Sequence, residues 1–293
     1  MESIHRTVLL NEIIEGLNLQ NNSLILDCTF GGGGHSLEVL LKKSNTKIIA
    51  LDQDSSVWEK AKGKFKGLEN RITFVNTNFK DLDKVSGKVD GIIFDLGLSS
   101  DQLENSGRGF SFLKDEPLFM TMKENPQAED LTAMDVVNLW NEENLADIIY
   151  GYGEEKFSRR IAKGIVEARK KGEIKTTFDL VKIIEKVVPA IYRRGRINPA
   201  TKTFQALRIA VNDELGALKE GLEKGFNQLK VGGRMSVISF HSLEDRITKK
   251  FYKNLEKEGK AKLINKKPII ADSEELKNNP RARSAKLRIL EKV

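Results

Sequence analysis

The alternation of short apolar segments with helical segments constrains the fold of this chain more than any other feature. The apolar segments are residues 24–27 (LILD), 47–52 (KIIALD), 71–79 (RITFVNTNF) and 89–100 (VDGIIFDLGLSS). Each is short enough to be a strand, and amphipathic stretches of helical period separate them. This alternation predicts an α/β fold built on a parallel sheet.

The alternation stops for about a hundred residues and then resumes. Helical patterns and loops fill the stretch from Leu103 to about Ile197, and none of them resembles a strand of the sheet. An all-α insertion is the natural interpretation. We therefore expect a discontinuous sheet domain, residues 1–103 and 203–293, and a helical insertion domain over residues 104–202.

The resumption is expected to begin with one long helix. Asn198 is a candidate N-cap, Pro199 suits the first helical turn, and an apolar stripe with steps of three and four continues to Leu229. GGRMSVISF then restores the strand rhythm, and two apolar segments within residues 260–293 look like a closing hairpin. Residues 274–284 between them are predicted to be a loop.

Composition limits the classes of function. The single cysteine, Cys28, excludes an internal disulfide and fits a reducing cytosol, and with three histidines it leaves little material for a structural zinc site. No run of 18 apolar residues is present and the N-terminus carries acidic residues, so we expect neither a membrane span nor a secretory signal.

Positive charge is concentrated in three segments. The chain has a net charge of +7, and Lys and Arg cluster in residues 156–175, 193–208 and 281–288. Such fields attract phosphate-rich partners, although a solvated basic surface is the plain alternative. The distribution favours a nucleic-acid partner.

A run of four glycines follows the first predicted strand, in TFGGGGHS. Glycine allows close approach of the backbone and positive φ, and at a strand–helix turn this usually serves a nucleotide-like ligand. Asp52, about twenty residues further on, can accept the hydroxyls of a ribose. Asp27 adds negative charge beside the turn, which disfavours pyrophosphate and favours a cationic ligand such as S-adenosylmethionine. Capping roles for both aspartates are the alternative.

Two further residues are candidates at the same edge of the sheet. Asp95 ends the fourth predicted strand, where open α/β sheets bind ligands. Phe79, at the end of the third, can lie against an adenine ring or pack in the core.

Six motifs extend along the whole chain in a fixed order. They are TFGGGGHS (29–36), DLGLSSDQL (95–103), RGFSF (108–112), NPATKTFQALRIAVNDEL (198–215), ISFHSLEDR (238–246) and NPRARSAKLR (279–288). Together they closely resemble the bacterial ribosomal RNA small-subunit methyltransferase H family. The resemblance implies a Rossmann-like class I methyltransferase domain with a helical insertion. It also implies methyl transfer from S-adenosyl-L-methionine to the exocyclic N4 amine of a cytosine in the decoding region of 16S rRNA, with neither a membrane nor DNA as partner.

The resemblance also assigns candidate residues for binding the cofactor. It implies that Gly33, Gly34 and His35 line the methionine end and that Asp52 holds the ribose. Phe79 would flank the adenine, and the pocket would be completed by Asp95 and Gln102.

The sequence departs from the family pattern in one loop and at two isolated positions. Phe119 and Thr121 replace an acidic and a basic residue, and Lys123 replaces another acidic one. Cys28 stands where glycine is usual, and Asn198 replaces a histidine. If the loop positions the RNA or assists proton loss, activity or substrate choice is altered.

Methyl transfer to an amine needs alignment and an acceptor for the proton that nitrogen loses. The candidate acceptors are Asp101, Ser99, His241 and Glu244, with His241 alternatively a capping residue. The target base is expected to be single-stranded or flipped out. The candidate contacts to the RNA backbone are Arg193, Arg194, Arg196, Arg281 and Arg283.

Two other functions compete with this one. A nicotinamide oxidoreductase would need glycine or alanine near position 36 and no Asp27 beside the helix start, and neither condition is met. A catalytically silent RNA-binding or ribosome-assembly factor could retain the pocket, and the altered 115–123 loop gives that hypothesis some weight.

Overall fold

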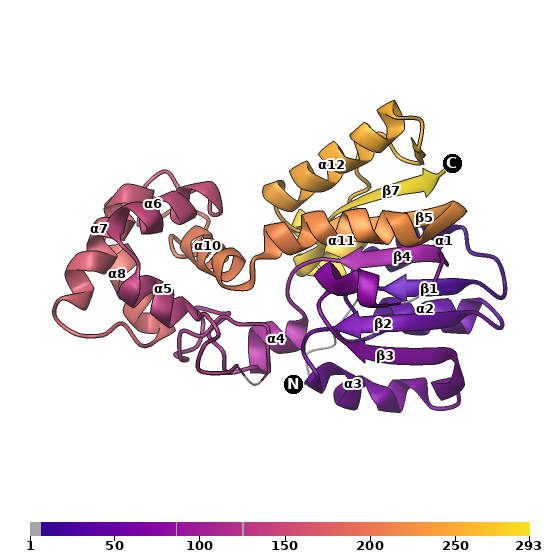
Figure 1. Ribbon diagram of the computed structural model, residues 1–293. Helices are drawn as coiled ribbons and strands as arrows, with labels where there is room; N and C mark the ends of the chain where they lie inside the picture. The colour runs from indigo at the N-terminus through magenta and orange to yellow at the C-terminus, as the bar shows by residue number, and fades with distance from the viewer. Residues whose placement is uncertain (1–6, 86, 125) are drawn as a thin grey trace. The chain divides into compact units, whose positions relative to one another are not determined.

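A computed structural model describes residues 7–85, 87–124 and 126–293 (Figure 1). Contacts divide the chain into two compact units. The sheet unit comprises the residues up to Gly97 together with Leu215–Val293, and the helical unit comprises Leu98–Glu214. The helical unit is thus slightly longer at both ends than the insertion predicted from the sequence.

The sheet unit contains one seven-stranded sheet with the order β3-β2-β1-β4-β5-β7-β6. Its strands are β1 (Leu24–Asp27), β2 (Lys47–Asp52), β3 (Ile72–Asn76), β4 (Val89–Asp95), β5 (Leu229–Ser239), β6 (Ala261–Leu263) and β7 (Lys286–Lys292). The first five pair in parallel, and β7 is antiparallel to both β5 and β6. The 3-2-1-4-5 order is that of a Rossmann-like sheet, which confirms the predicted α/β class I methyltransferase fold.

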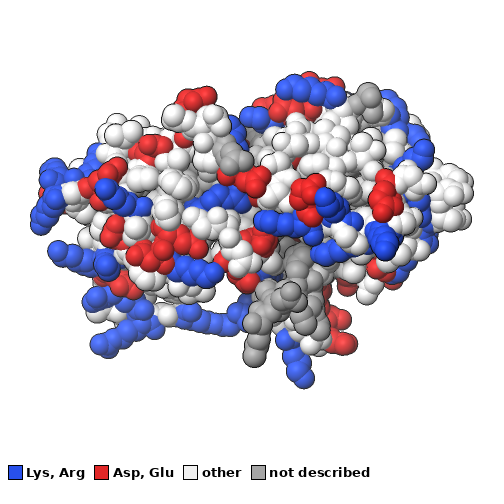
Figure 2. Space-filling model, turned by 90° about the horizontal axis from the view of Figure 1, so that it is seen from below, with Lys and Arg blue, Asp and Glu red and all other residues white. Residues whose placement is uncertain are grey.

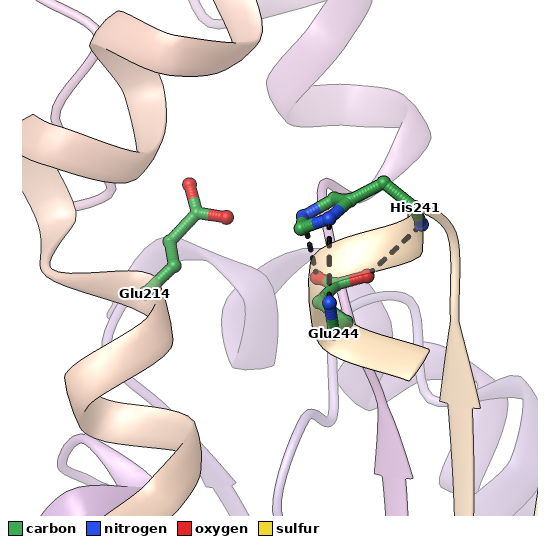
Figure 3. A group of neighbouring side chains, drawn as sticks. All are labelled: Glu214, His241 and Glu244. Atoms are coloured by element: carbon green, nitrogen blue, oxygen red, sulfur yellow. Dashed lines mark hydrogen bonds and ion pairs between the residues drawn. The ribbon is translucent and has the colours of Figure 1, made fainter. Parts of the chain in front are cut away.

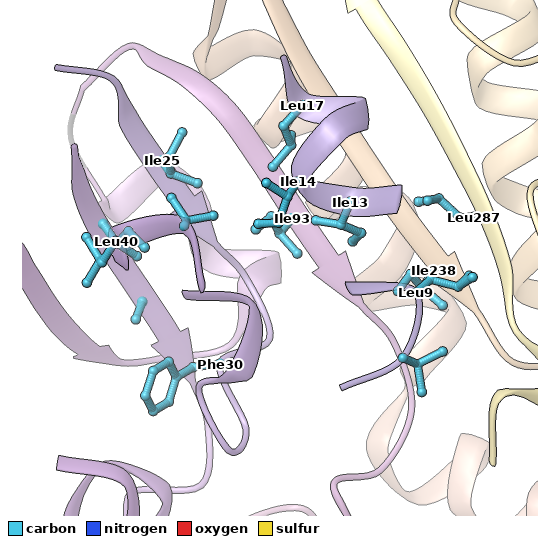
Figure 4. Close-up of a cluster of buried hydrophobic side chains, with 14 of the residues drawn as sticks. Leu9, Ile13, Ile14, Leu17, Ile25, Phe30, Leu40, Ile93, Ile238 and Leu287 are labelled. Atoms are coloured by element: carbon cyan, nitrogen blue, oxygen red, sulfur yellow. The ribbon is translucent and has the colours of Figure 1, made fainter. Parts of the chain in front are cut away.

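Helices cover both faces of this sheet. They are α1 (Leu10–Leu17), α2 (Gly34–Lys42), α3 (Ser56–Ala61), α11 (Glu214–Gln228), α12 (Ser242–Lys257) and α13 (Ser273–Asn278), with 3-10 turns at Lys62–Phe65, Glu69–Arg71, Phe79–Lys84 and Pro280–Ser284. On one face, α1 contributes Ile13 and Leu17 to a core shared with Ile25 of β1 and Ile93 of β4 (Figure 4). On the other, Leu222 of α11 joins a second core with strand residues.

The helical unit has its own hydrophobic core. Its helices are α4 (Ser100–Asn105), α5 (Ala133–Leu139), α6 (Glu142–Gly151), α7 (Ser158–Arg169), α8 (Thr177–Val187), α9 (Ala190–Arg193) and α10 (Thr201–Asn212). Reciprocal capping boxes start two of them, Thr132 with Asp135 and Thr176 with Asp179, so local sequence fixes where these helices begin. None of the helices described here or in the sheet unit is long and apolar enough to cross a membrane.

The prediction of one long helix from Asn198 to Leu229 is wrong. The segment forms α10 and α11, separated by Asp213 in the left-handed region with φ of 45°. The first of these begins at Thr201, while Asn198 accepts a hydrogen bond from the Ala200 N–H at 2.8 Å in a turn before it. The apolar stripe continues across the break, so its period conceals the break.

Three other local predictions need correction. Residues 274–284 are α13 and a 3-10 turn rather than a loop. β6 and β7 do pair antiparallel, but α13 and other residues separate them, so they are no hairpin. β3 ends at Asn76, and Phe79 opens a 3-10 turn instead of ending the strand.

Candidate functional site

The glycine-rich turn connects β1 to α2 at the carboxyl edge of the sheet. Gly31 and Gly33 have φ of 49° and 73°, a region that favours glycine. A Cβ on Gly33 would lie 2.7 Å from the Phe30 ring and 2.9 Å from the Phe65 ring. A Cβ on Gly34 would lie 1.8 Å from the Thr7 hydroxyl oxygen. The turn therefore needs glycine at position 33 for both conformation and space, and at position 34 for space.

Asp52, at the end of β2, holds this turn in place. Its carboxylate accepts hydrogen bonds from the Gly31 and Asp54 N–H groups, both at 2.9 Å. Burial raises its pKa to about 6, while these two hydrogen bonds act in the opposite direction. The carboxylate is half-buried, so the capping role and a role toward a ribose are compatible.

Asp27, at the end of β1, is turned toward the start of α2. It accepts a hydrogen bond from the Ser36 hydroxyl at 2.6 Å and from the Thr29 N–H at 3.2 Å. Burial raises its pKa to about 6. Ser36, considered above only as a missing glycine, thus has a definite role. The sequence signal for this hydrogen bond was a serine nine residues after the aspartate that ends the strand.

Asp95, at the end of β4, faces His35 of α2. Its Oδ2 lies 3.6 Å from the His35 Nδ1, and the His35 Nε2 is 3.1 Å from the Val8 carbonyl oxygen. Burial, followed by the charges of Asp27 and Glu244, raises the pKa of Asp95 to about 8. The Asp95 Oδ1 is buried and has no hydrogen-bond partner among the described residues. A buried acceptor of this kind is suited to a donor or a cation of a bound ligand.

The three carboxylates share one property. Within the described residues, Asp27, Asp52 and Asp95 form no ion pair with lysine or arginine. They are the last residues of β1, β2 and β4. The strand order reverses between β1 and β4, so these carboxylates lie on both sides of that point. A cationic ligand at this edge would favour the ionised form of these carboxylates, whose pKa values burial raises.

Phe79 is packed against the protein. Its ring contacts Phe94 edge-on at a centroid distance of 5.5 Å, and a Cβ on Gly221 would meet it at 2.7 Å. The side chain is half-buried, so part of the ring stays accessible. Core packing is therefore one of its roles, and the contact with an adenine stays a prediction.

His241 and Glu244 form a capping box at the start of α12, directly after β5 (Figure 3). The His241 Nδ1 accepts from the Glu244 N–H at 3.4 Å, and the Glu244 carboxylate accepts from the N–H groups of Phe240 and His241 at 2.8 and 3.3 Å. The imidazole Nε2 lies 3.3 Å from a Glu244 oxygen. The capping alternative for His241 is thus confirmed.

Ser99, Asp101 and Gln102 belong to the helical unit. Ser99 and Gln102 form the capping box of α4, each accepting a hydrogen bond from the other's N–H at 3.1 Å. Asp101 accepts from the Asn105 amide at 3.2 Å and is half-buried. Glu214 at the end of this unit pairs with Arg208 at 2.7 Å.

The loop that departs from the family pattern is held through its backbone. Arg108 donates to the carbonyl oxygens of Thr121, Met122 and Lys123, and Asn212 donates to that of Met120. Thr121 is buried and Phe119 half-buried. The Thr121 hydroxyl also accepts a hydrogen bond from the Lys123 N–H at 3.3 Å, so both backbone contacts and this side chain hold the loop.

The remaining two departures are readily placed. Cys28 is buried, and burial raises the pKa of its thiol well above the usual range, so it is no nucleophile. Asn198 is exposed.

The candidate RNA-binding arginines are all exposed. Arg193 ends α9 in the helical unit, and Arg194 and Arg196 follow it. Arg281 and Arg283 lie in the 3-10 turn after α13 in the sheet unit. In Figure 2, Lys and Arg side chains line the left-hand edge, which belongs to the helical unit, with acidic residues among them.

Comparison with known proteins gives one consistent result. The sequence profile of the MraW methylase family matches residues 2–293. Ribosomal RNA small subunit methyltransferase H of Clostridium botulinum (strain Kyoto / Type A2) is 47% identical over 100% of both chains. The protein of the same name from Brevibacillus brevis is 46% identical over 99% of this chain and 98% of its own. An rRNA methylase structure from Streptococcus thermophilus aligns with a TM-score of 0.46 at 12% identity, covering 99% of each chain. The chain therefore belongs to the MraW methylase family.

Proposed function

We propose that this chain transfers a methyl group from S-adenosyl-L-methionine to the exocyclic N4 amine of a cytosine in the decoding region of 16S rRNA. The full-length identity with small-subunit rRNA methyltransferases supports this proposal. The substrate is proposed to be the small ribosomal subunit or its RNA, which makes the reaction cytoplasmic.

The observation that carries the proposal is the set of three carboxylates beside the glycine turn, Asp27, Asp52 and Asp95, which have no lysine or arginine partner among the described residues. S-adenosylmethionine supplies a methyl group on a cationic sulfonium, and its ribose offers hydroxyl donors. Asp95, with a buried oxygen that has no partner, fits a cationic ligand, and Asp52 fits the ribose. Gly33, Gly34 and His35 would line the methionine end, and Phe79 and Gln102 would complete the pocket.

The chain's part in the chemistry is to align the amine and accept its proton. Positive charge grows on the cytosine nitrogen as the new bond forms, and an oxygen acceptor stabilises it. Ser99, His241 and Glu244 serve as caps, and Asp101 accepts a hydrogen bond from the Asn105 amide. All four are proposed as candidates for the proton acceptor.

The five exposed arginines are proposed to contact RNA phosphates, which leaves the base free to be flipped into the site. A silent assembly factor is the second candidate, and the residues at positions 119 and 121 favour it. Their loop is anchored by Arg108 through backbone atoms and by the Thr121 hydroxyl.

The decisive experiment is methyl transfer from labelled S-adenosylmethionine to small subunits that lack the modification, followed by nucleoside mass spectrometry. We expect label in 4-methylamino-cytidine. Tight S-adenosylhomocysteine binding without transfer would favour the silent factor, and Phe119→Asp with Thr121→Arg would then test whether the departures are responsible.

A further inference from the structure

A shallow pocket in the sheet unit is lined by four cationic side chains. Lys249 and Lys253 come from α12, Lys266 from the segment between β6 and β7, and Arg288 from β7. The remaining lining residues are uncharged, so no carboxylate lines the pocket. The pocket lies outside the candidate site described above.

Arg288 is built into the pocket rather than attached to its surface. Its side chain is 7% exposed, and its guanidinium donates to Asp245 at 2.7 and 3.3 Å through Nε and one terminal nitrogen. Asp245 fixes the guanidinium plane in this way, and the other terminal nitrogen donates no hydrogen bond within the described part of the chain. A fixed guanidinium with free donors is suited to a phosphate.

The positive charges of the three lysines around Arg288 are not neutralised by acidic side chains of the described residues. Lys249 and Lys253 are four residues apart on α12, a spacing at which like charges repel. Neither they nor Lys266 form an ion pair with any described residue, and the neighbouring Asp245 is already shared by Arg288 and Lys286. An anion in the pocket would relieve this repulsion.

The axis of α12 gives the distance from the carboxyl edge of the sheet to this pocket. α12 follows β5 directly and starts after His241. At 1.5 Å per residue, Lys249 and Lys253 lie about 12 and 18 Å along the axis from His241. A stacked strand advances on the order of 3.4 Å per nucleotide. If the target cytosine lies at the start of α12 and the RNA follows this helix, the span corresponds to about four or five nucleotides.

We propose that the Lys249–Lys253–Lys266–Arg288 pocket binds a backbone phosphate of the substrate RNA, about four or five nucleotides from the target cytosine. The proposal rests on the proposed function. It adds a contact that neither the sequence motifs nor the five candidate arginines include.

The test uses the full chain and a variant with K249Q, K253Q and K266Q. Arg288 is left in place because its ion pair with Asp245 supports the fold. We expect the KM for a decoding-region RNA to rise about tenfold, with a smaller fall in kcat. The slope of log affinity against log salt should become shallower by about 0.7, the contribution of one lost phosphate contact on a single strand.

A matched variant with K250Q, K257Q and K262Q controls for net charge. It removes the same charge from exposed positions of α12 and β6 that do not line the pocket. We expect its KM and salt slope to stay near those of the unaltered protein. Equal effects in the two triple variants would overturn the proposal, because only general charge would then matter.

RNA length locates the contact. RNAs shortened from one end and then from the other are compared in direct binding assays. The penalty of the pocket variant should disappear once fewer than about four nucleotides remain on one side of the target. A penalty independent of length on both sides would contradict the proposal. So would thermal protection by inorganic phosphate with unchanged RNA binding, which would indicate a small-anion site.

Failure of the proposed function is distinguishable from failure of this inference. Absence of methyl transfer by the unaltered protein counts against the function, whereas the RNA-binding assays need no turnover. Binding of S-adenosylhomocysteine, equal in all three proteins, shows that the substitutions leave the fold intact.

Discussion

The carboxylates at the carboxyl edge of the sheet and those inside the helical unit differ in their partners. At the sheet edge, Asp27, Asp52 and Asp95 hold turns and helix starts but have no cationic partner among the described residues. In the helical unit, the buried Glu155 accepts from Tyr192 and the Phe157 N–H, and Glu214 pairs with Arg208. The carboxylates of the first region thus lack the partners that a ligand could supply, whereas Glu155 and Glu214 of the second region are paired within the protein.

The largest effect is expected from the glycine turn. Gly33→Ala introduces a Cβ at φ of 73° against two aromatic rings. We expect about 100-fold weaker binding of S-adenosylhomocysteine by calorimetry, since such strain costs roughly 1–3 kcal/mol. Gly63→Ala is the control because a Cβ there meets nothing within 4 Å. Unchanged binding by the Gly33 variant would show that the sheet edge is not the ligand side.

The next effect separates charge from shape. Asp95→Asn keeps the side-chain size but removes the charge facing a cationic ligand. At pH 8.5, above its pKa of about 8, we expect affinity for S-adenosylmethionine to fall about tenfold or more, and affinity for neutral S-adenosylhomocysteine to fall less.

Asp83→Asn, which alters an exposed ion pair with Lys224, is the control for the Asp95 variant. The penalty should shrink at pH 6.5, where Asp95 is mostly protonated. Equal losses for both ligands would mean that Asp95 acts through structure alone.

The helical unit is tested by its exposed arginines. A variant with Arg193, Arg194 and Arg196 changed to Gln should bind RNA about tenfold more weakly, with a salt slope shallower by about 2. Binding of S-adenosylhomocysteine should not change.

The charge-matched control for this variant changes Lys163, Lys182 and Lys186, exposed on α7 and α8. If it weakens RNA binding as much, the α9 loop has no special role.

The unneutralised edge should also be visible in stability. Burial raises the pKa of Asp27 and Asp52 to about 6 and of Asp95 to about 8 from 3.8. The folded protein then binds protons more tightly than the unfolded one, so stability falls as pH rises from about 4 to about 8. We expect the Tm of the ligand-free protein to be a few degrees higher at pH 6 than at pH 8.5. A flat profile would contradict this account of the edge.

The smallest effect concerns a cap in the helical unit. Ser99→Ala removes one half of the α4 capping box, and we expect a loss of about 1 kcal/mol, or roughly 2–4 °C in Tm. Turnover should stay within threefold. His241→Asn keeps a capping side chain at the start of α12 in the sheet unit but removes the imidazole. It therefore tests whether the imidazole has a catalytic role besides capping the helix. A fall in kcat of a hundredfold at unchanged Tm would identify either side chain as catalytic.

Strong local patterns made most of the sheet predictable. The first four strands begin within one residue of the predicted starts because buried parallel strands are short apolar runs bounded by turn residues. The break at Asp213 was not predictable, because a left-handed aspartate leaves the apolar period intact on either side. α1 was predictable but missed, because Leu10, Ile13, Ile14 and Leu17 have the spacing of one helix face.

The candidate site was predictable in its composition and less so in its contacts. Strand ends and glycines located the three carboxylates, since parallel strands bring their carboxyl ends to one edge. That Asp27 bonds Ser36 and that His241 caps α12 depends on side-chain directions that spacing does not specify. The lysine pocket joins α12 to β7 and to a segment between strands, so tertiary structure alone assembles it.

The position of β7 has a consequence for synthesis of the protein. β7 lies between β5 and β6 although both precede it in the chain. Until residues 286–292 leave the ribosome, β5 exposes an unpaired edge and the apolar positions that later receive Leu287 and Ile289 stay open. A nascent or truncated chain that lacks this strand is therefore prone to edge-to-edge aggregation. Translation that stalls late in the message would be more harmful than translation that stalls early.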